Sequence, residues 1–589
     1  MIAKETRSLR GRSLSNTRLA VALLATTALG GTVAYADEIT FFLPGNLLLS
    51  RSVYDSPASI LAVGTTLPPG CTPATAAASG TPCVAAVADG TYPTVFNNAI
   101  IDASFGITAP IFVDEMLTIP SGDVVQTIQV PNSTERGVIA STDQMVTSFS
   151  SKSEIALNLS LDRNSVSFMG YLSPVSAIDV SNSNTPDVID PTNPVPSFDF
   201  RVVASVDQFG QFHFTKTNAY SGNNGRAAIL NNANGANVYY TAGNAGNGSN
   251  PQPNGVILGA GNQIITASKL ALAQQPDPGQ PAPVGSFSVT ELGDKADKVG
   301  KDTNFRGLTV FNNVIYTTKG SGSNGVNTVY FIDTSGNGTN GTPAACPKGT
   351  GVPNPSATLP TTPIAFTAAN LQTQGVTPLN MCILNGFPTG LAKATTPTPL
   401  FPFGVFFANP TTLYVSDEGN GDTTFNGSTF TGAATQTTAG LQKWVLNTQT
   451  NTWSLAYTLQ AGLNLGVPYI VKDYPTGINA ATGLPWAPAT DGLRNITGRV
   501  NPDGTVSIWA ITSTVSGGGD QGADPNRLVM ITDKVTATTL PAKESFSTVR
   551  TAKFGEVLRG ISFTPGTGLS PGQEIGSLLC DFGICPSQH

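Results

Sequence analysis

The sequence predicts an all-β protein, a six-bladed β-propeller closed by strands from both ends of the chain. Three observations predict this fold class. A strand–turn–strand motif recurs six times, the composition is rich in turn residues, and incomplete units at the two ends complement each other. Repeated supersecondary units bury their faces against one another, so such a series favours one closed body.

Each repeat is an apolar run that begins at an arginine or a substitute, followed by a tight turn and a second apolar run. Turns containing Asn, Asp and Gly separate the two runs, as β-hairpins require. In chain order, the copies begin at Glu154, Arg226, Arg306, Phe403, Arg494 and Arg559.

Five copies extend into units of four strands, because two further β-rich runs follow each hairpin. After Glu154 we expect strands at 165–173, 201–206 and 212–217; after Arg226 at 237–242, 263–268 and 286–290; after Arg306 at 314–318, 328–332 and 363–367; after Phe403 at 413–416, 440–446 and 453–459; and after Arg494 at 506–512, 527–532 and 545–550.

The two ends of the chain supply the sixth unit. Residues 46–54, 110–118 and 124–130 are three strands without a first one, and residues 558–565 are a lone first strand. Joining them closes the ring and removes exposed sheet edges. The propeller is therefore expected over residues 37–566, with insertions at 56–109 and 334–400 and a tail at 567–589.

Composition agrees with many short strands. The 589 residues include 62 Gly and 43 Pro, and only 11% are charged. The net charge is −7 and no basic tract follows the N-terminal segment, so nucleic acid is an unexpected partner.

Residues 1–36 have the pattern of a signal peptide. Basic residues precede an apolar run at 19–29, and Ala34-Tyr35-Ala36 fits the small-residue cleavage rule. No later apolar run is long enough to span a membrane. We therefore expect an exported protein, periplasmic or extracellular.

The six cysteines fall into three local pairs, which suits structural disulfides in an oxidising compartment. The expected pairs are Cys71 with Cys83, Cys346 with Cys382, and Cys580 with Cys585.

Arginines recur at the start of four inner strands, with Glu154 at the fifth site and Pro402-Phe403 at the sixth. A ring of guanidinium groups would grip carboxylate or phosphate, so an anionic small molecule, a glycan or a partner protein is the expected ligand. Alternatively, the arginines tie blades together through carbonyls or through Asp491, Asp302 or Glu556. The four residues are Arg226, Arg306, Arg494 and Arg559.

An acidic loop, Asp417-Glu418-Gly-Asn-Gly-Asp422, follows a second strand, and Asp520 and Asp524 occupy the equivalent loop one unit later. Clustered oxygen ligands with glycines suit Ca²⁺, although the spacing lacks the twelfth-position glutamate of an EF-hand. A solvated acidic turn is the alternative.

Histidine chemistry has little support, because the chain contains only His213, in a predicted outer strand, and the terminal His589. A Ser-His-Asp triad or a histidine-bound metal is therefore not expected. Hydrolysis would need a carboxylate base with a bound cation, for which Asp417 and Glu154 are the candidates.

Four phrases resemble a family of exported bacterial six-bladed propellers of unassigned function. They are Arg201-Val-Val-Ala-Ser-Val-Asp, Tyr220-Ser-Gly-Asn-Asn-Gly-Arg, Pro402-Phe-Gly-Val-Phe-Phe-Ala and Leu558-Arg-Gly-Ile-Ser-Phe. The blade pattern more distantly resembles gluconolactonase/regucalcin-like and NHL-repeat propellers. That resemblance implies a divalent cation in the channel held by Glu, Asn and Asp, with Glu154 at a corresponding position and arginines where other ligands would stand.

We expect a binding or interaction module whose channel mouth engages an anionic ligand or a partner protein. Two alternatives remain open. One is a divalent-cation-dependent hydrolase of the lactonase or phosphoesterase type, and the other is a purely structural surface protein.

Overall fold

The structure is a computed structural model, and it divides into two units, Met1–Phe41 and Phe42–His589. All the strands described belong to the second unit. The residues described are 41–54, 64–67, 70–79, 82–86, 106–132, 144–148, 154–186, 195, 197–244, 261–267, 304–320, 326–334, 346, 349–361, 381–390, 392, 400–518 and 524–568.

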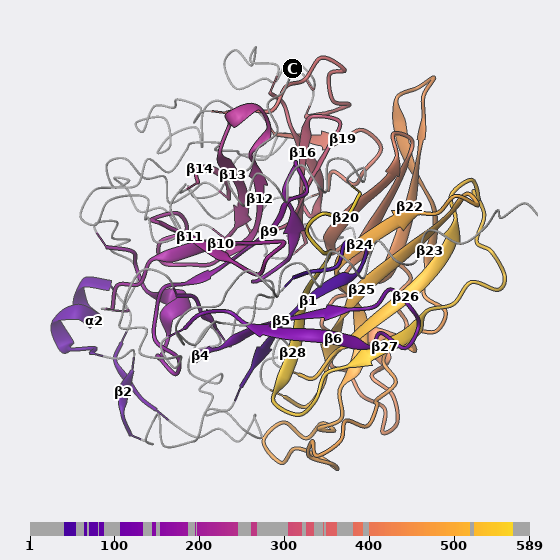
Figure 1. Ribbon diagram of the computed structural model, residues 1–589. Helices are drawn as coiled ribbons and strands as arrows, with labels where there is room; N and C mark the ends of the chain where they lie inside the picture. Colours follow the sequence, from indigo (N-terminus) through magenta and orange to yellow (C-terminus); the bar gives the residue numbers. More distant parts are fainter. Residues whose placement is uncertain are drawn as a thin grey trace, which may run out of the picture. The chain divides into compact units, whose positions relative to one another are not determined.

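Six sheets form the blades of a β-propeller, which confirms the predicted fold class (Figure 1). From inner to outer strand, blade 1 is β8 (Asn158–Leu159), β9 (Ser165–Tyr171), β10 (Arg201–Asp207) and β11 (Phe212–Thr217). Blade 2 is β12 (Gly225–Asn231), β13 (Val238–Gly243) and β14 (Asn262–Thr266). Blade 3 is β15 (Phe305–Phe311), β16 (Val314–Lys319), β17 (Thr328–Ile332), β19 (Met381–Leu384) and β18 (Thr350–Gly351).

The remaining blades have four strands each. Blade 4 is β20 (Pro402–Asn409), β21 (Thr412–Asp417), β22 (Gly440–Asn447) and β23 (Thr452–Leu459). Blade 5 is β24 (Ala489–Val500), β25 (Thr505–Val515), β26 (Arg527–Lys534) and β27 (Ser547–Thr551). Blade 6 is β28 (Glu556–Phe563), β1 (Leu47–Val53), β5 (Ile111–Met116) and β6 (Val124–Gln129).

The ring closes within blade 6, as expected from the complementary ends of the sequence. Strand β28, from the C-terminal end, pairs antiparallel with β1, from the N-terminal end, with Leu47 opposite Phe563 and Val53 opposite Glu556. Figure 1 shows the yellow β28 beside the indigo β1. Hydrogen bonds between the two ends of the chain therefore replace what would otherwise be two open edges.

The fourth strand of blade 3 differs from the prediction. Residues 363–367 lie outside the described part of the chain, and β19 occupies the place beside β17. All four β19 side chains are buried, and Cys382 joins Cys346, with their Cα atoms 5.9 Å apart. The insertion at 334–400 thus contributes the outer strands of the blade, including β18, which pairs parallel to β19.

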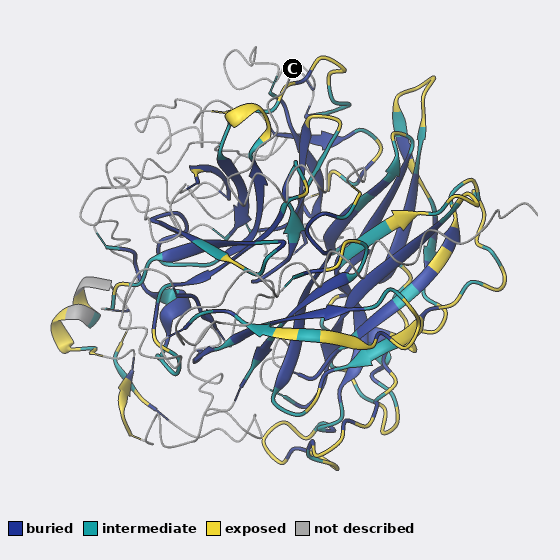
Figure 2. Ribbon diagram, viewed as in Figure 1, coloured by how far each residue is buried: buried dark blue, intermediate teal, exposed yellow. Residues whose placement is uncertain are grey.

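In blade 6, burial decreases from the inner strand to the outer strand (Figure 2). Every residue of the inner strands β12 and β28 is buried, whereas no residue of the outer strand β6 is. His213 lies in β11, the outermost strand of blade 1, as predicted. Inner strands packed on both faces are what allow a repeat protein to position side chains rigidly at its centre.

Glycines let the inner strands of neighbouring blades approach closely. A Cβ atom at Gly307 would lie 1.9 Å from the carbonyl oxygen of Phe403, and one at Gly560 would lie 2.3 Å from the carbonyl oxygen of Ile155. At Gly404 the nearest atom would be the carbonyl oxygen of Arg494, at 2.8 Å. The glycine that follows the motif's first position is therefore a packing requirement.

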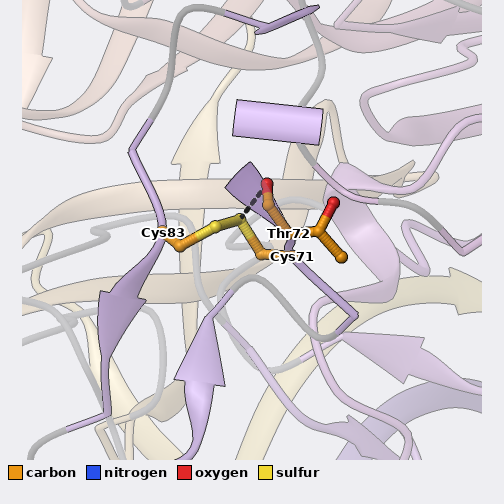
Figure 3. The surroundings of a disulfide bond; sticks show 3 residues. All are labelled: Cys71, Thr72 and Cys83. Atoms are coloured by element: carbon orange, nitrogen blue, oxygen red, sulfur yellow. Dashed lines mark hydrogen bonds between the residues drawn. A yellow bond between two sulfur atoms is a disulfide. The ribbon is translucent and has the colours of Figure 1, made fainter. Parts of the chain in front are cut away.

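Two of the three predicted disulfides are present. Cys71 and Cys83 form a disulfide in the first insertion (Figure 3). The helix α2 (Pro73–Ser79) lies between the two cysteines in sequence. Cys83 immediately precedes β3 (Val84–Ala85), which pairs with β2 (Thr66–Leu67). Cys346–Cys382 is the second. Two further short strands, β4 (Thr108–Ala109) and β7 (Thr147–Ser148), pair with each other, and the other helical turns are η2 (Val180–Asn182), η3 (Ala233–Gly235) and α3 (Thr431–Ala434).

Several predictions fall outside the described residues: the signal peptide at 1–36, the strand at 286–290, Asp302, Asp520, the Cys580–Cys585 pair and His589. They stay predictions. In the part of the chain that is described, no helix is both long and apolar enough to cross a membrane.

Candidate functional site

The inner strands of all six blades line a central channel of about 340 Å³. Its wall carries one or more residues from each blade just after the motif's first position, among them Ala156, Ile229, Leu308, Val405, Ile496 and Ile561. The first position of each motif therefore lies at one end of this channel, which we call the channel mouth.

The arginine side chains predicted from the repeat interact electrostatically at the channel mouth. Burial lowers the pKa of Arg226 to about 9; repulsion by Arg306 adds to this effect, and Glu418 opposes it. Burial also lowers the pKa of Arg494, although Glu418 opposes that shift, and Arg306 and Arg559 add to it. Arg226 therefore interacts electrostatically with Arg306, and Arg494 interacts with Arg306 and Arg559.

Glu418 bridges two of these arginines. Its Oε1 lies 3.0 Å from Nη1 of Arg306, and its Oε2 lies 3.2 Å from Nε of Arg494. Arg306 also stands over the ring of Phe403, with its Cζ 5.5 Å from the ring centroid. One carboxylate therefore links arginines from the inner strands of blades 3 and 5.

The sequence did not reveal Glu418 as the arginines' partner, since it belonged to the predicted calcium loop. Two of the partners considered instead, Glu556 and Asp491, have other contacts. Glu556 pairs with Arg51 at 3.1 Å, and Asp491 accepts hydrogen bonds from the Gly421 amide and the Gln436 side chain. Gly419 and Gly421 were the sequence feature that could have indicated this pairing, because glycines allow the loop to pack against the start of β24.

A cleft of about 300 Å³ lies at the mouth between blades 3, 4 and 5. Arg306, Arg494, Glu418 and Asp491 line it, and Ser513 and Thr514 at the end of β25 add hydroxyl groups, together with Gly320, Phe401, Gly419, Asn420 and Gly421. Since a liquid water molecule occupies about 30 Å³, the cleft has room for about ten, or for a ligand of similar size.

The loop of residues 418–421 fits this cleft only because of its glycines. Gly419 has a φ of +83°, and a Cβ there would lie 2.4 Å from Oδ2 of Asp491. At Gly421 the backbone N–H donates to the same Asp491 oxygen at 2.8 Å. The Asp-Glu-Gly-Asn-Gly sequence therefore folds around Asp491, and this contact also positions Glu418 against the arginines.

Two aspartates beside the arginines have strongly perturbed acidity. Burial raises the pKa of Asp417 from 3.8 to about 7, although the Phe401 and Gly419 amides donate to it. Burial likewise raises the pKa of Asp491 from 3.8 to about 7, against hydrogen bonds from Gly421 and Gln436. Glu418 raises both values further by repulsion. Near neutral pH, the charge of this region therefore depends on pH.

Asp417→Asn is expected to flatten the pH dependence of stability. Because the folded pKa of Asp417 is raised, its contribution to stability is complete below pH ~4 and is lost as pH rises to ~7, by up to about 1.4 kcal/mol per pH unit. Urea unfolding at pH 5, 6 and 7 measures this slope. Identical slopes for the variant and the native protein would contradict the assignment, whatever their absolute stabilities.

Glu154 and Arg226 form a second polar group at the mouth. Glu154 is fully buried and accepts hydrogen bonds from the hydroxyls of Tyr171 and Thr147 and from the Ser148 amide. Arg226 donates from Nη1 to Asn304 and to the Phe305 carbonyl oxygen at 3.2 Å. The contacts of Arg226 join blades 2 and 3, which supports the interpretation that this arginine holds blades together, whereas those of Glu154 stay within blade 1 and β7.

Arg559 joins β28 to the N-terminal strand of blade 6 in a similar way. Its Nε donates to Ser52 at 3.3 Å and its Nη2 donates to the Tyr54 hydroxyl. Both partners belong to the N-terminal part of the blade, so Arg559 helps to hold the ring closed. The cleft itself is lined by Arg306 and Arg494 of the four aligned arginines.

The residues predicted to bind calcium have other partners. Asp417 is fully buried against amides, Glu418 pairs with arginines, and the exposed Asp422 accepts hydrogen bonds from the amide and hydroxyl of Thr424. Among the described residues, no three His, Cys, Asp or Glu side chains gather as metal ligands. Asp524 bonds to Tyr474 and Thr514. Calcium binding stays a prediction.

The fold and this cleft define a six-bladed β-propeller with a mixed arginine–carboxylate site at its channel mouth. No protein-family model and no curated protein sequence matches the chain. Among solved structures it is similar to a presumed gluconolactonase, with 12% identity and a TM-score of 0.25, aligned over 68% of this chain and 90% of that one. It is also similar to NanB in a structure with Optactamide, with 6% identity and a TM-score of 0.31, over 76% and 64%. At these values neither protein indicates what this chain binds.

Proposed function

We propose that this is an exported binding protein whose channel-mouth cleft takes a small ligand that carries a carboxylate. The observation that carries the proposal is the shared Glu418: two buried arginines, from the inner strands of blades 3 and 5, face one carboxylate in a cleft of about 300 Å³. A carboxylate on a ligand would offer acceptors to the terminal nitrogens of Arg494, which have no partner among the described residues. The two disulfides fit an oxidising compartment.

Arg494 is the residue best placed to contact the ligand. Its Nε donates to Glu418, and its two terminal nitrogens have no partner among the described residues, while its side chain is 7% exposed and lines the cleft. A guanidinium group presents two parallel N–H donors to a carboxylate, which gives both strength and orientation. We therefore assign the ligand carboxylate to the terminal nitrogens of Arg494.

Arg494→Gln is expected to weaken binding of 4-methylpentanoate by about tenfold to a hundredfold, since a hydrogen bond to a charged group contributes about 1.5–3 kcal/mol. Glu418→Gln is expected to tighten binding, because it removes the internal carboxylate that competes for the same arginines. Isothermal titration calorimetry at low salt measures both changes. The neutral 4-methylpentanamide, which has the same shape, is the matched ligand control.

The opposite signs of the two changes separate this proposal from general effects on folding. A misfolded cleft would lose affinity in both variants. Equal binding of the acid and the amide, or unchanged acid affinity in Arg494→Gln, would overturn the proposal.

A further inference from the structure

A lysine and an aspartate that line neither the channel nor the cleft meet in the interior between blades 4 and 5. Lys443 of β22 and Asp533 of β26 are both fully buried, and Nζ lies 2.9 Å from Oδ2. The two residues are 90 positions apart in sequence. An amine and a carboxyl group are the two reactants of an amide bond, and the fold holds them in contact and away from water.

Two other hydrogen bonds orient the Lys443 amine. Its Nζ donates to the Tyr457 hydroxyl at 2.9 Å and to the Lys534 carbonyl oxygen at 2.6 Å. The third N–H therefore points at Asp533. Transfer of that proton to Oδ2 leaves a neutral amine whose lone pair faces the carboxyl group. Because burial penalises both charges, this neutral pair is closer in free energy to the ion pair here than in water.

Glu544, between β26 and β27, adds a proton to the same cluster. Its Oε1 accepts from the Lys534 amide at 3.3 Å, and among the described residues no group donates to its buried Oε2. Glu544 also hydrogen-bonds to Asp533, and two carboxyl groups in contact need a shared proton. Burial, the hydrogen bond with Asp533 and repulsion by Asp533 raise the pKa of Glu544 above its ordinary value. The shared proton is therefore on Glu544.

We propose that Lys443 and Asp533 condense to an amide bond that joins blades 4 and 5 covalently, with Glu544 as the catalytic residue that moves the protons. Condensation in bulk water is unfavourable, because both ions are solvated and water is in excess. Within one folded chain, well-oriented groups reach effective concentrations of about 10⁵–10⁸ M, and a buried site excludes water.

The atoms of this step balance without a co-reactant. After the proton transfer to Oδ2, the Lys443 nitrogen attacks Cγ of Asp533, and the carbonyl electron pair moves onto Oδ1. The Tyr457 hydroxyl donates to Oδ1 at 2.8 Å and so stabilises the charge that develops there. Glu544 gives its proton to Oδ2 and takes one from the nitrogen. The bond from Cγ to Oδ2 breaks, one water leaves, and the carbonyl group re-forms.

Mass spectrometry of the denatured, trypsin-digested protein tests the bond, because an ion pair separates in denaturant and an amide does not. Without the bond, trypsin cleaves after Lys443 and releases residues 394–443, 444–472 and 528–534 as separate peptides. With the bond, Lys443 resists cleavage, and residues 394–472 stay joined to 528–534 at a mass lower by one water than their sum. We expect the joined species. Separate peptides alone would overturn the proposal.

Glu544→Gln is expected to lower the joined fraction at least about tenfold in freshly folded protein, because an amide side chain cannot exchange protons as a carboxyl group does. Glu556→Gln, the same change in an ion pair of blade 6, is the matched control and should leave that fraction unchanged. An unchanged fraction in Glu544→Gln would overturn the role of Glu544. None of these outcomes bears on carboxylate binding, since the reacting residues do not line the cleft.

Discussion

Gly307→Ala is expected to cost at least about 3 kcal/mol of unfolding free energy, because the added Cβ would lie 1.9 Å from the backbone carbonyl of Phe403. The contact joins the inner strands β15 and β20 of adjacent blades, and a backbone atom cannot rotate away as a flexible side chain can. The blades would have to separate at the centre of the ring. Urea unfolding followed by circular dichroism measures the loss.

Gly504→Ala is the matched control for this substitution. Gly504 lies in the turn between β24 and β25 with a φ of +81°, and a Cβ there meets nothing within 4 Å. Backbone strain alone should cost about 1 kcal/mol. A Gly307→Ala variant no less stable than Gly504→Ala would show that the inner strands do not pack as closely as described.

Lys443→Met is expected to cost about 3–5 kcal/mol, as is usual when one partner of a buried ion pair is removed. Lys443 and Asp533 are both fully buried, with Nζ 2.9 Å from Oδ2, and they join blades 4 and 5. Burial alone would raise the pKa of Asp533, but hydrogen bonds with Glu544, Tyr414, Lys443 and Tyr457 hold it below its ordinary value. The variant would leave this charge without its cation.

Lys534→Met removes the same charge at an exposed position in the same strand as Asp533 and serves as the control. Its cost should stay below about 1 kcal/mol. Chemical denaturation of both variants at pH 7 gives the comparison. Similar losses in the two would mean that the Lys443–Asp533 pair contributes no more than a surface charge.

The ring of blades was predictable from sequence because the repeat and its closure are local patterns. The missing first strand before β1 and the lone β28 are each visible in the chain, and their pairing follows from the need to remove open edges. Blade 3 was harder. Its fourth strand, Met381–Leu384, is short and without alternation, and the Cys346–Cys382 link that fixes it spans 36 residues of insertion.

The candidate site was predictable in part. Alignment of the repeats gave Arg306 and Arg494 a common position, and the acidic loop that contains Glu418 was expected to follow a second strand. The pairing of Glu418 with Arg494 depends on the contact between the loop after β21 and β24, and these two residues are 76 positions apart. No local pattern distinguishes a carboxylate that meets an arginine across blades from one in a solvated or cation-binding loop.

The four arginines occupy the same position of the repeat, yet they have different surroundings. Arg226 and Arg559 donate to neighbouring carbonyl, amide and hydroxyl groups and so stabilise the ring. Arg306 and Arg494 share Glu418 and line a cleft. The repeat supplied four equivalent positions, and the loops of blades 4 and 5 gave two of them a different environment.

The central claim, that this cleft binds carboxylates, is tested most directly by titrating 4-methylpentanoate and 4-methylpentanamide into the native protein. We expect saturable binding of the acid, with a single site per chain, and no measurable binding of the amide. Equal affinities for the two, or an acid affinity that Arg494→Gln leaves unchanged, would contradict the account.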